Sequence, residues 1–281
     1  ASALTATSVE FHGGAGNDSI EGSQAQDRIF GDDGNDVIHS DGNLAGIRGS
    51  ADWIDGGAGD DWIEADGPEG GLSAADTIYG GAGNDTILSD GGEGARDSIL
   101  GGDGDDVIYT GGGNDFADGG AGDDILLGGD GGEGANDTLL GGDGRDVLFG
   151  DGGSSADRRA GTDLLRGGAG EDILLAGLYI PTDDESVLAI RDLWASSGYY
   201  IQRVLALFGG SAQSSSEYLI SLNENTFNDR SSATPTSTSV ADVVYGDAGQ
   251  DWFMVDFGED SYPGIASDEL LLDLHWLFMP A

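Results

Sequence analysis

The sequence contains no cysteine, only five prolines, and ten basic residues against 53 acidic ones. Without cysteine, neither a disulfide framework nor a cysteine-based zinc site can form. The formal net charge of -43 argues against nucleic acid as a partner, because phosphate binding needs a basic surface. No apolar run approaches the roughly 18 residues that indicate a membrane-spanning helix. The acidic residues are spaced periodically rather than run together, which indicates carboxylates that await a cation.

What the chain has in abundance is glycine, at 53 of 281 residues, and it recurs in a nine-residue unit. The stretch GGAGNDTIL, residues 80–88, is one copy of the pattern G-G-x-G-x-D-x-U-x, in which U is a large apolar residue. Seventeen copies tile residues 13–254, and all insertions fall in even-numbered copies, such as DGNLAGIRGSA before Asp52. Two copies per coil of a flattened solenoid would stack the odd-numbered turns along one edge, here called the odd edge. The even-numbered turns would form the opposite, even edge, where loops are tolerated.

Each position of the unit has a physical role in such a coil. Glycines at positions one, two and four permit positive φ and close approach of successive turns. The tail D-x-U-x is expected to form a very short strand with U pointing inward. On the odd copies the inward residues are Ile20, Ile38, Ile63, Ile87, Ile108, Leu126, Leu148, Leu174 and Phe253. Turn carbonyls and position-six carboxylates then face the space between turns, and such hard oxygen ligands suit Ca²⁺.

This pattern resembles the repeats-in-toxin (RTX, hemolysin-type) family of calcium-binding nonapeptide repeats, over residues 13–175 and 242–254. The resemblance implies an all-β, right-handed parallel β-roll, in which each ion lies between turns two units apart. The position-six aspartates of both turns and the turn carbonyls would hold the ion. Carried over to the odd edge, these residues are Asp18, Asp36, Asp61, Asp85, Asp106, Asp124, Asp146, Asp172 and Asp251. On the even edge they are Asp27, Asp52, Asp76, Asp97, Asp115, Asp137, Asp163 and Asp242. The accompanying turn glycines are Gly14, Gly16, Gly34, Gly57, Gly59, Gly81, Gly83, Gly102, Gly104, Gly120, Gly122, Gly142, Gly144, Gly168 and Gly170.

Charge favours coupling of metal binding to folding. Up to about fifteen divalent ions would fit the gaps between turns and reduce the net charge from -43 to -13. The metal-free roll should repel itself strongly, so we expect the chain to be disordered in chelator and folded in millimolar calcium.

The sequence divides into a lead-in at 1–12, the roll at 13–175, an insertion at 176–241, a final coil at 242–254 and a cap at 255–281. Only Val9 and Phe11 could plug the first coil, which leaves head-to-tail self-association open.

Two further segments are expected to be helical. The outward positions of the odd strands become apolar in later copies, and one or two amphipathic helices over about 183–208 are expected to cover them. A partner or the surface of a membrane is the less favoured cover. The stretch SDELLLDLHWLF places leucines on one helical stripe, which predicts a helical cap.

Nothing in the sequence indicates catalysis. His12, His39 and His275 are scattered, and no zinc-protease motif, serine elbow or phosphate-binding loop is present. Trp53 and Trp62 could stack on sugars, although packing beneath the neighbouring insertions is favoured.

Two classes of function follow. The first is a structural, adhesive or self-assembling element, in a filament or surface layer, of a secreted or cell-surface protein of bacterial type. Its partners would be calcium, further copies of itself, and a glycan or protein at the even-edge insertions. The second is the folding and export module of a type I-secreted enzyme or toxin.

Overall fold

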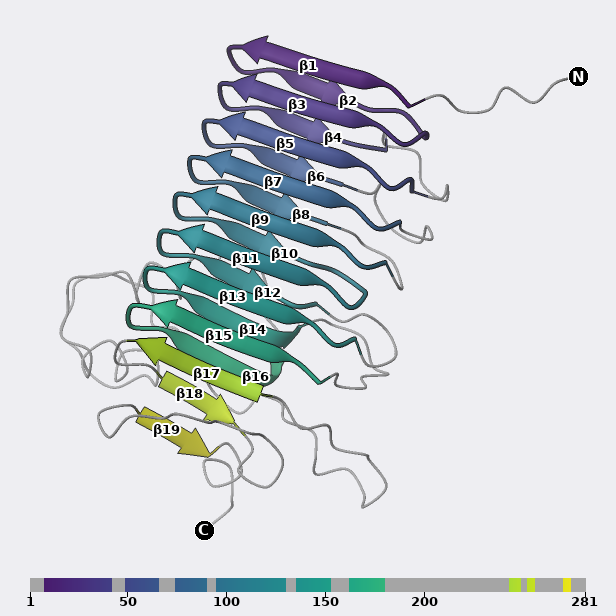
Figure 1. Ribbon diagram of the computed structural model, residues 1–281. Coiled ribbons are helices and arrows are strands. Elements are labelled where there is room, and N and C mark those ends of the chain that lie inside the picture. The colour runs from purple at the N-terminus through teal and green to yellow at the C-terminus, as the bar shows by residue number, and fades with distance from the viewer. Residues whose placement is uncertain are drawn as a thin grey trace, which may run out of the picture.

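The fold is described by a computed structural model, which covers residues 8–41, 49–65, 74–89, 95–129, 135–152, 162–179, 243–248, 252–255 and 270–273. Over these residues the chain is all-β, and its strands form two parallel sheets that face each other (Figure 1). No helix in this part of the chain is long and apolar enough to cross a membrane. The expected β-roll is confirmed.

Strands alternate between the two sheets along the chain, so each pair of nine-residue copies makes one coil (Figure 1). The nine-stranded sheet consists, in spatial order, of β1 (Glu10–Ala15), β3 (Arg28–Asp33), β5 (Trp53–Ala58), β7 (Thr77–Ala82), β9 (Ser98–Asp103), β11 (Phe116–Ala121), β13 (Thr138–Asp143), β15 (Leu164–Ala169) and β17 (Val243–Ala248). The ten-stranded sheet consists of β2 (Ser19–Glu21), β4 (Val37–His39), β6 (Trp62–Glu64), β8 (Thr86–Leu88), β10 (Val107–Tyr109), β12 (Ile125–Leu127), β14 (Val147–Gly152), β16 (Ile173–Tyr179), β18 (Trp252–Val255) and β19 (Leu270–Asp273).

Insertions on the even edge leave the strand register unchanged. Trp53 pairs with Thr77 across 24 positions of sequence, whereas Val107 pairs with Ile125 across 18. In both cases the inward residues stay opposite inward residues, because a one-residue slip would turn the core side chains to solvent.

The strands of the nine-stranded sheet are longer than the sequence predicts. Up to β13 they have six residues, whereas the strands of the facing sheet up to β12 have three. The extra residues are the opening glycines of the next odd copy, and Gly57 pairs with Gly81 within the ladder. Glycine pairs in a strand through its backbone alone, and a pattern based on side-chain alternation does not detect it.

The core is a double column of aliphatic side chains between the sheets. Ile38, Ile63 and Ile87 on the ten-stranded sheet have no exposed surface, nor have Ile54 and Ile78 on the facing sheet. The same column continues through Ile108, Leu126, Leu148 and Leu174, as the repeat predicts. At the N-terminal end Phe11 packs against this core, whereas Val9 is 39% exposed.

The outward face of the ten-stranded sheet changes along the solenoid. Val37 and Trp62 are exposed near the N-terminal end, whereas Ile125, Val147 and Ile173 are buried. The later part of this face is therefore covered, as its apolar sequence requires. The helices expected over 183–208 lie outside the described residues.

The C-terminal prediction needs correction. Residues Leu270–Asp273 form β19, which pairs in parallel with β18, and not a helix. Three consecutive leucines fit a buried strand and a helix equally well, and the open edge of β18 supplies backbone partners.

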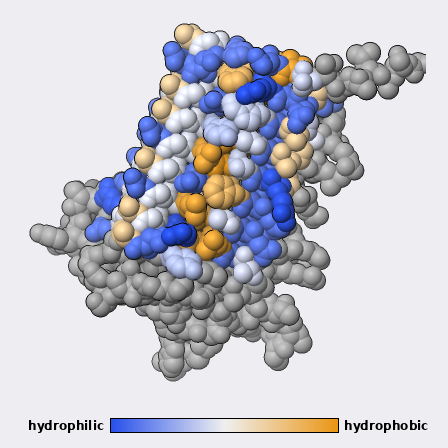
Figure 2. Space-filling model, in the orientation of Figure 1, coloured by the Kyte–Doolittle hydropathy of each residue, from blue (hydrophilic) through white to orange (hydrophobic). Residues whose placement is uncertain are grey.

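The two tryptophans do not form one surface. Trp53 lies on β5 and Trp62 on β6, so they belong to different sheets. Trp53 packs between Phe30 and Tyr79, with ring centroids 5.0 and 5.4 Å away, and Arg28 lies over its ring. The outward face of the nine-stranded sheet carries a stripe of apolar side chains flanked by polar ones (Figure 2).

Truncating the core column should destabilise the folded roll. We expect Ile87→Ala to lower the free energy of unfolding by about 2–5 kcal/mol, because the cavity cannot collapse between two hydrogen-bonded sheets. Urea unfolding in saturating calcium measures this change. Thr86→Ala, on the outward side of the same strand, is the control and should cost far less. An equal loss in both variants would contradict the assigned core.

Candidate metal centre

The odd turns have the backbone geometry that the repeat predicts. All of the predicted turn glycines have positive φ, including Gly81 at 121° and Gly83 at 131°. A methyl group at Gly83 would lie 2.2 Å from the carbonyl oxygen of Gly59 on the preceding coil. Adjacent turns are thus stacked so closely that only glycine fits. Asp32 and Asp247 occupy position two with φ of 73° and 71°, a conformation that Asp tolerates better than most residues.

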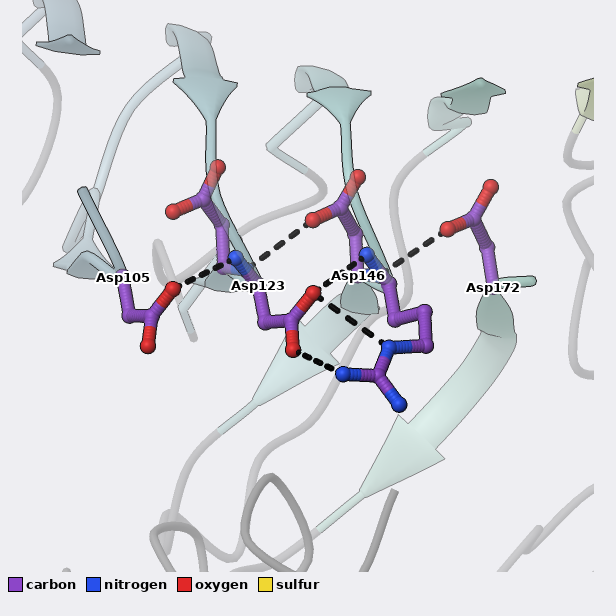
Figure 3. A network of polar contacts seen from close by, with 6 residues as sticks. Asp105, Asp123, Asp146 and Asp172 are labelled. Carbon is purple, nitrogen blue, oxygen red and sulfur yellow. Dashed lines mark hydrogen bonds and ion pairs between the residues drawn. The ribbon is translucent and has the colours of Figure 1, made fainter. Parts of the chain in front are cut away.

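The position-six aspartates form a continuous ladder along the odd edge. The backbone N–H of each donates to Oδ1 of the aspartate on the next coil, as Asp61 does to Asp85 at 2.8 Å and Asp146 to Asp172 at 2.9 Å (Figure 3). The ladder joins, in order, Asp18, Asp36, Asp61, Asp85, Asp106, Asp124, Asp146 and Asp172. The sequence-predicted residues are therefore brought together from coil to coil.

The second carboxylate oxygen of these residues is buried and has no hydrogen-bond partner in the structure. This applies to Oδ2 of Asp18, Asp36, Asp61, Asp85, Asp106, Asp124 and Asp146. Burying an unpaired carboxylate oxygen costs several kcal/mol unless a counter-charge lies beside it. A row of such atoms is the arrangement expected of cation ligands.

Backbone carbonyls converge on the same places. A methyl group at Gly80 would lie 2.5 Å from Oδ2 of Asp85 and 2.6 Å from the carbonyl oxygen of Gly101. At Gly56 the corresponding distances are 2.5 Å to Asp61 and 2.5 Å to the carbonyl of Gly80. Gly56 and Gly80, the first glycines of their copies, thus each border a place that a side chain would fill, lined by one carboxylate oxygen and one carbonyl oxygen.

The donor set is that of a hard cation. Among the described residues, no three His, Asp or Glu side chains converge as a metal site. A bound ion would therefore rely on carboxylates combined with main-chain carbonyls, which is the ligand chemistry of Ca²⁺ and not of Zn²⁺. His39 lies 3.0 Å from Glu64 instead, which fits a surface histidine.

Burial raises the pKa of the odd-edge carboxyls. The pKa is about 7 for Asp85, about 8 for Asp106 and about 9 for Asp146. Desolvation is the main cause at each, neighbouring carboxylates add to it, and the backbone N–H of the preceding coil opposes it. At neutral pH these groups are poised to hold either a proton or a metal ion.

A second ladder at position five, which the sequence analysis missed, runs beside the first. Here the side-chain oxygen accepts from the backbone N–H of the next coil, so the donor and acceptor are reversed relative to position six. Asp105 accepts from Asp123 at 2.8 Å, and Asp123 accepts from Arg145 at 3.0 Å (Figure 3). Arg145 also places its guanidinium 2.7 Å from Asp123. The recurrence of Asn or Asp at position five, from Asn17 onward, was the available signal.

The even edge repeats the position-six ladder. Backbone N–H groups donate to Oδ1 of the next aspartate from Asp27 through Asp52, Asp76, Asp97, Asp115 and Asp137 to Asp163, over 2.6–2.8 Å. Burial raises the pKa of Asp52 to about 6 and that of Asp76 to about 9. Asp242 and Asp251 lie outside the described residues.

Comparison with known families agrees with this geometry. The family model described as "RTX calcium-binding nonapeptide repeat (4 copies)" matches residues 11–43, 48–67, 71–95, 100–132, 131–154, 159–178 and 241–262. No curated protein matches the chain at a significant level. The matched residues include the odd-edge turns and most residues of the strands up to β16, whereas residues 96–99, which include the start of β9, lie between two matches.

Cation binding should release protons. The raised pKa values favour the protonated carboxyls in the metal-free fold, whose stability therefore increases as pH falls from about 9 towards the ordinary Asp value near 4. Binding should weaken over the same range. Calorimetric titration with calcium at pH 8, in two buffers of different ionisation enthalpy, measures the protons released from turns that are already folded before calcium binds. Equal heats in both buffers would show that the carboxyls are ionised before calcium binds, as they are in an unfolded chain.

Filling the space beside Asp85 should impair binding. Gly80→Ala places a methyl group against Oδ2 of Asp85 and the carbonyl of Gly101, which we expect to cost about 1–3 kcal/mol and to raise the calcium concentration needed for folding. The control is Ala82→Gly, two residues away at an exposed position. Calcium titrations followed by circular dichroism compare the two. A midpoint for Gly80→Ala equal to that of the wild type would exclude this space as the site.

Proposed function

The chain belongs to the RTX calcium-binding nonapeptide repeat family, and we propose that its odd edge is a continuous row of calcium sites whose occupation folds the roll. The row of buried, unpartnered Oδ2 atoms is the observation that carries the proposal. RTX repeats bind calcium, and this chain repeats the same carboxylate geometry coil after coil.

The ligands follow from the stacking of the odd turns. Between two neighbouring coils, the two position-six aspartates and the turn carbonyls would hold the ion; in one gap these are Asp61, Asp85 and the Gly80 carbonyl. Calcium supplies the positive charge that the buried carboxylates need. The protein stacks the turns, excludes water from Oδ2 and fixes Oδ1 by a backbone hydrogen bond.

The roll acts as a scaffold and not as an enzyme. Its polar clusters are accounted for by the repeat, and the described histidines pair with carboxylates at the surface. We propose a structural or adhesive role in a secreted or cell-surface protein, where millimolar calcium is available to weak extracellular sites. Recognition of a glycan or protein would fall to the even-edge insertions, because the odd turns are uniform.

Among the structural and adhesive roles we favour self-assembly, because of the strands at the ends of the two sheets. In the described part of the chain β1 and β2 lie at the ends of their sheets and have a strand on one side only (Figure 1). Such strands offer backbone groups with which another β-strand can pair. A second copy stacked end to end would continue both sheets.

Folding should depend on calcium. We expect the β-signal in circular dichroism to appear between chelator and millimolar calcium, because up to eight carboxylates of one ladder cannot be packed together unpaired. Asp85→Asn should shift the midpoint to higher calcium, and Asn84→Ala at the exposed neighbouring position should shift it less. The same spectrum in chelator and in calcium would reject the proposal.

Electron microscopy of the purified chain in calcium tests the assembly. Filaments or sheets that dissolve in chelator are the expected result. Dispersed monomers would instead favour a folding and export module of a secreted enzyme or toxin.

A further inference from the structure

One even-edge carboxylate differs from those of the odd edge in having both oxygens occupied by protein donors. Asp97 accepts the backbone N–H of Asp76 on Oδ1 at 2.8 Å. The hydroxyl of Ser89 donates to its Oδ2 at 2.6 Å. Both Ser89 and Asp97 are buried, with 0% and 3% of their surface exposed. An O–H···O⁻ contact of this length is a charge-assisted hydrogen bond, roughly twice as strong as a neutral one.

Ser89 occupies the repeat position that is glycine along the odd edge. It is the first residue of its copy of the repeat, residues 89–100, as Gly80 is in the preceding copy. At Gly80 a space faces Oδ2 of Asp85, and the structure offers that oxygen no donor. At Ser89 the side chain itself reaches the corresponding oxygen. The hydroxyl therefore takes the place that the odd edge leaves for a cation.

A second serine occupies both oxygens of an aspartate at the start of the edge, with its two donors exchanged. The hydroxyl of Ser23 donates to Oδ1 of Asp27 at 3.0 Å, where the backbone N–H of Val9 also donates at 3.1 Å, and the backbone N–H of Ser23 donates to Oδ2. Ser23 stands where the repeat has its second glycine. Serines at two different positions of the turn thus each donate to the position-six carboxylate of their own unit.

Between Asp27 and Asp97, two aspartates keep an unpartnered Oδ2 as on the odd edge, although Ser50 donates its hydroxyl to Oδ1 of Asp52 at 3.2 Å. Oδ2 of Asp52 and Oδ2 of Asp76 are buried without a hydrogen-bond partner. Asp52 donates its N–H to Oδ1 of Asp76 at 2.6 Å, so the two carboxylates face one gap between coils.

We propose that Ser23 and Ser89 replace a calcium ion at Asp27 and Asp97, so that calcium binds this stretch of the even edge only between Asp52 and Asp76. The inference rests on the proposed calcium sites of the odd edge. A calcium ion takes lone pairs at about 2.3–2.6 Å. A proton already directed at Oδ2 opposes it there, from the Ser89 hydroxyl at Asp97 and from the Ser23 backbone N–H at Asp27. The serine hydrogen bonds hold Asp27 and Asp97 without a metal ion, whereas the gap between Asp52 and Asp76 requires one.

The test compares two aspartates one coil apart on the same edge. Bound calcium per chain is measured by equilibrium dialysis for Asp76→Asn and Asp97→Asn in the whole chain at saturating calcium. We expect Asp76→Asn to lose at least one ion and Asp97→Asn to bind as many as the wild type. In the Asp97→Asn variant the new amide oxygen can still accept from Asp76, and the amide N–H₂ can donate to the hydroxyl of Ser89. Loss of an ion from Asp97→Asn, or none from Asp76→Asn, would overturn the inference.

Asp85→Asn on the odd edge separates this inference from the proposed function. If Asp85→Asn binds as many ions as the wild type, the odd-edge sites themselves are wrong. If it loses an ion, the comparison of Asp76→Asn with Asp97→Asn decides the inference alone.

Removing the serine hydroxyl supplies an independent readout that does not need Asp97→Asn to fold. Ser89→Ala should bind as many calcium ions as the wild type, or one more, because Oδ2 of Asp97 loses its donor. Ser98→Ala, on the outward side of β9, is the matched control and should change nothing. A lower ion count in Ser89→Ala would show that the hydroxyl is itself a calcium ligand and would overturn the inference.

Discussion

The structure depends on one constraint, a row of carboxylates buried between stacked turns with only one oxygen of each satisfied by the backbone. The hydrogen bond from each position-six N–H to Oδ1 of the next coil fixes the spacing of the coils. It also directs Oδ2 into the interior, where no protein donor meets it from Asp18 to Asp146 on the odd edge. Because an unpaired buried charge is costly, the roll needs cations in the way that other small folds need a larger apolar core.

The glycines and the thin core follow from the same constraint. Turns that share carboxylates and carbonyls must lie so close that a methyl group at Gly83 would meet the carbonyl of Gly59 at 2.2 Å. Each strand directs one apolar side chain into the core column, so the column contributes little per coil. Where the even edge departs from glycine, hydroxyl groups enter the same space, as Ser89 shows. The two edges therefore differ in chemistry although they share one ladder.

Most of the fold could be predicted because a repeat translates sequence position directly into place in the coil. The inward aliphatic residues, the positive-φ glycines and the position-six ladders all lie where the period predicts. The predictions failed where the period ends or carries no side-chain signal. The run Leu270–Asp273 is a strand because β18 offers it a free edge. A local sequence pattern carries no information about which strand lies beside it in the fold. The six-residue strands were missed because their second halves are the turn openings, such as Gly-Gly-Ala in β7, in which glycine carries no side-chain pattern.

The sequence by itself determined the coil, its core column and the carboxylates that face each gap, since all of these follow from a period of nine. Only the tertiary structure decided which oxygens of those carboxylates already have partners. Ser89 meets Asp97 across an insertion, and Ser50 meets Asp41 across another, at separations that belong to no period. Such contacts depend on how each loop closes over its turn. For that reason the difference between Asp85, which awaits a cation, and Asp97, which is held by a hydroxyl, appears only in the folded chain.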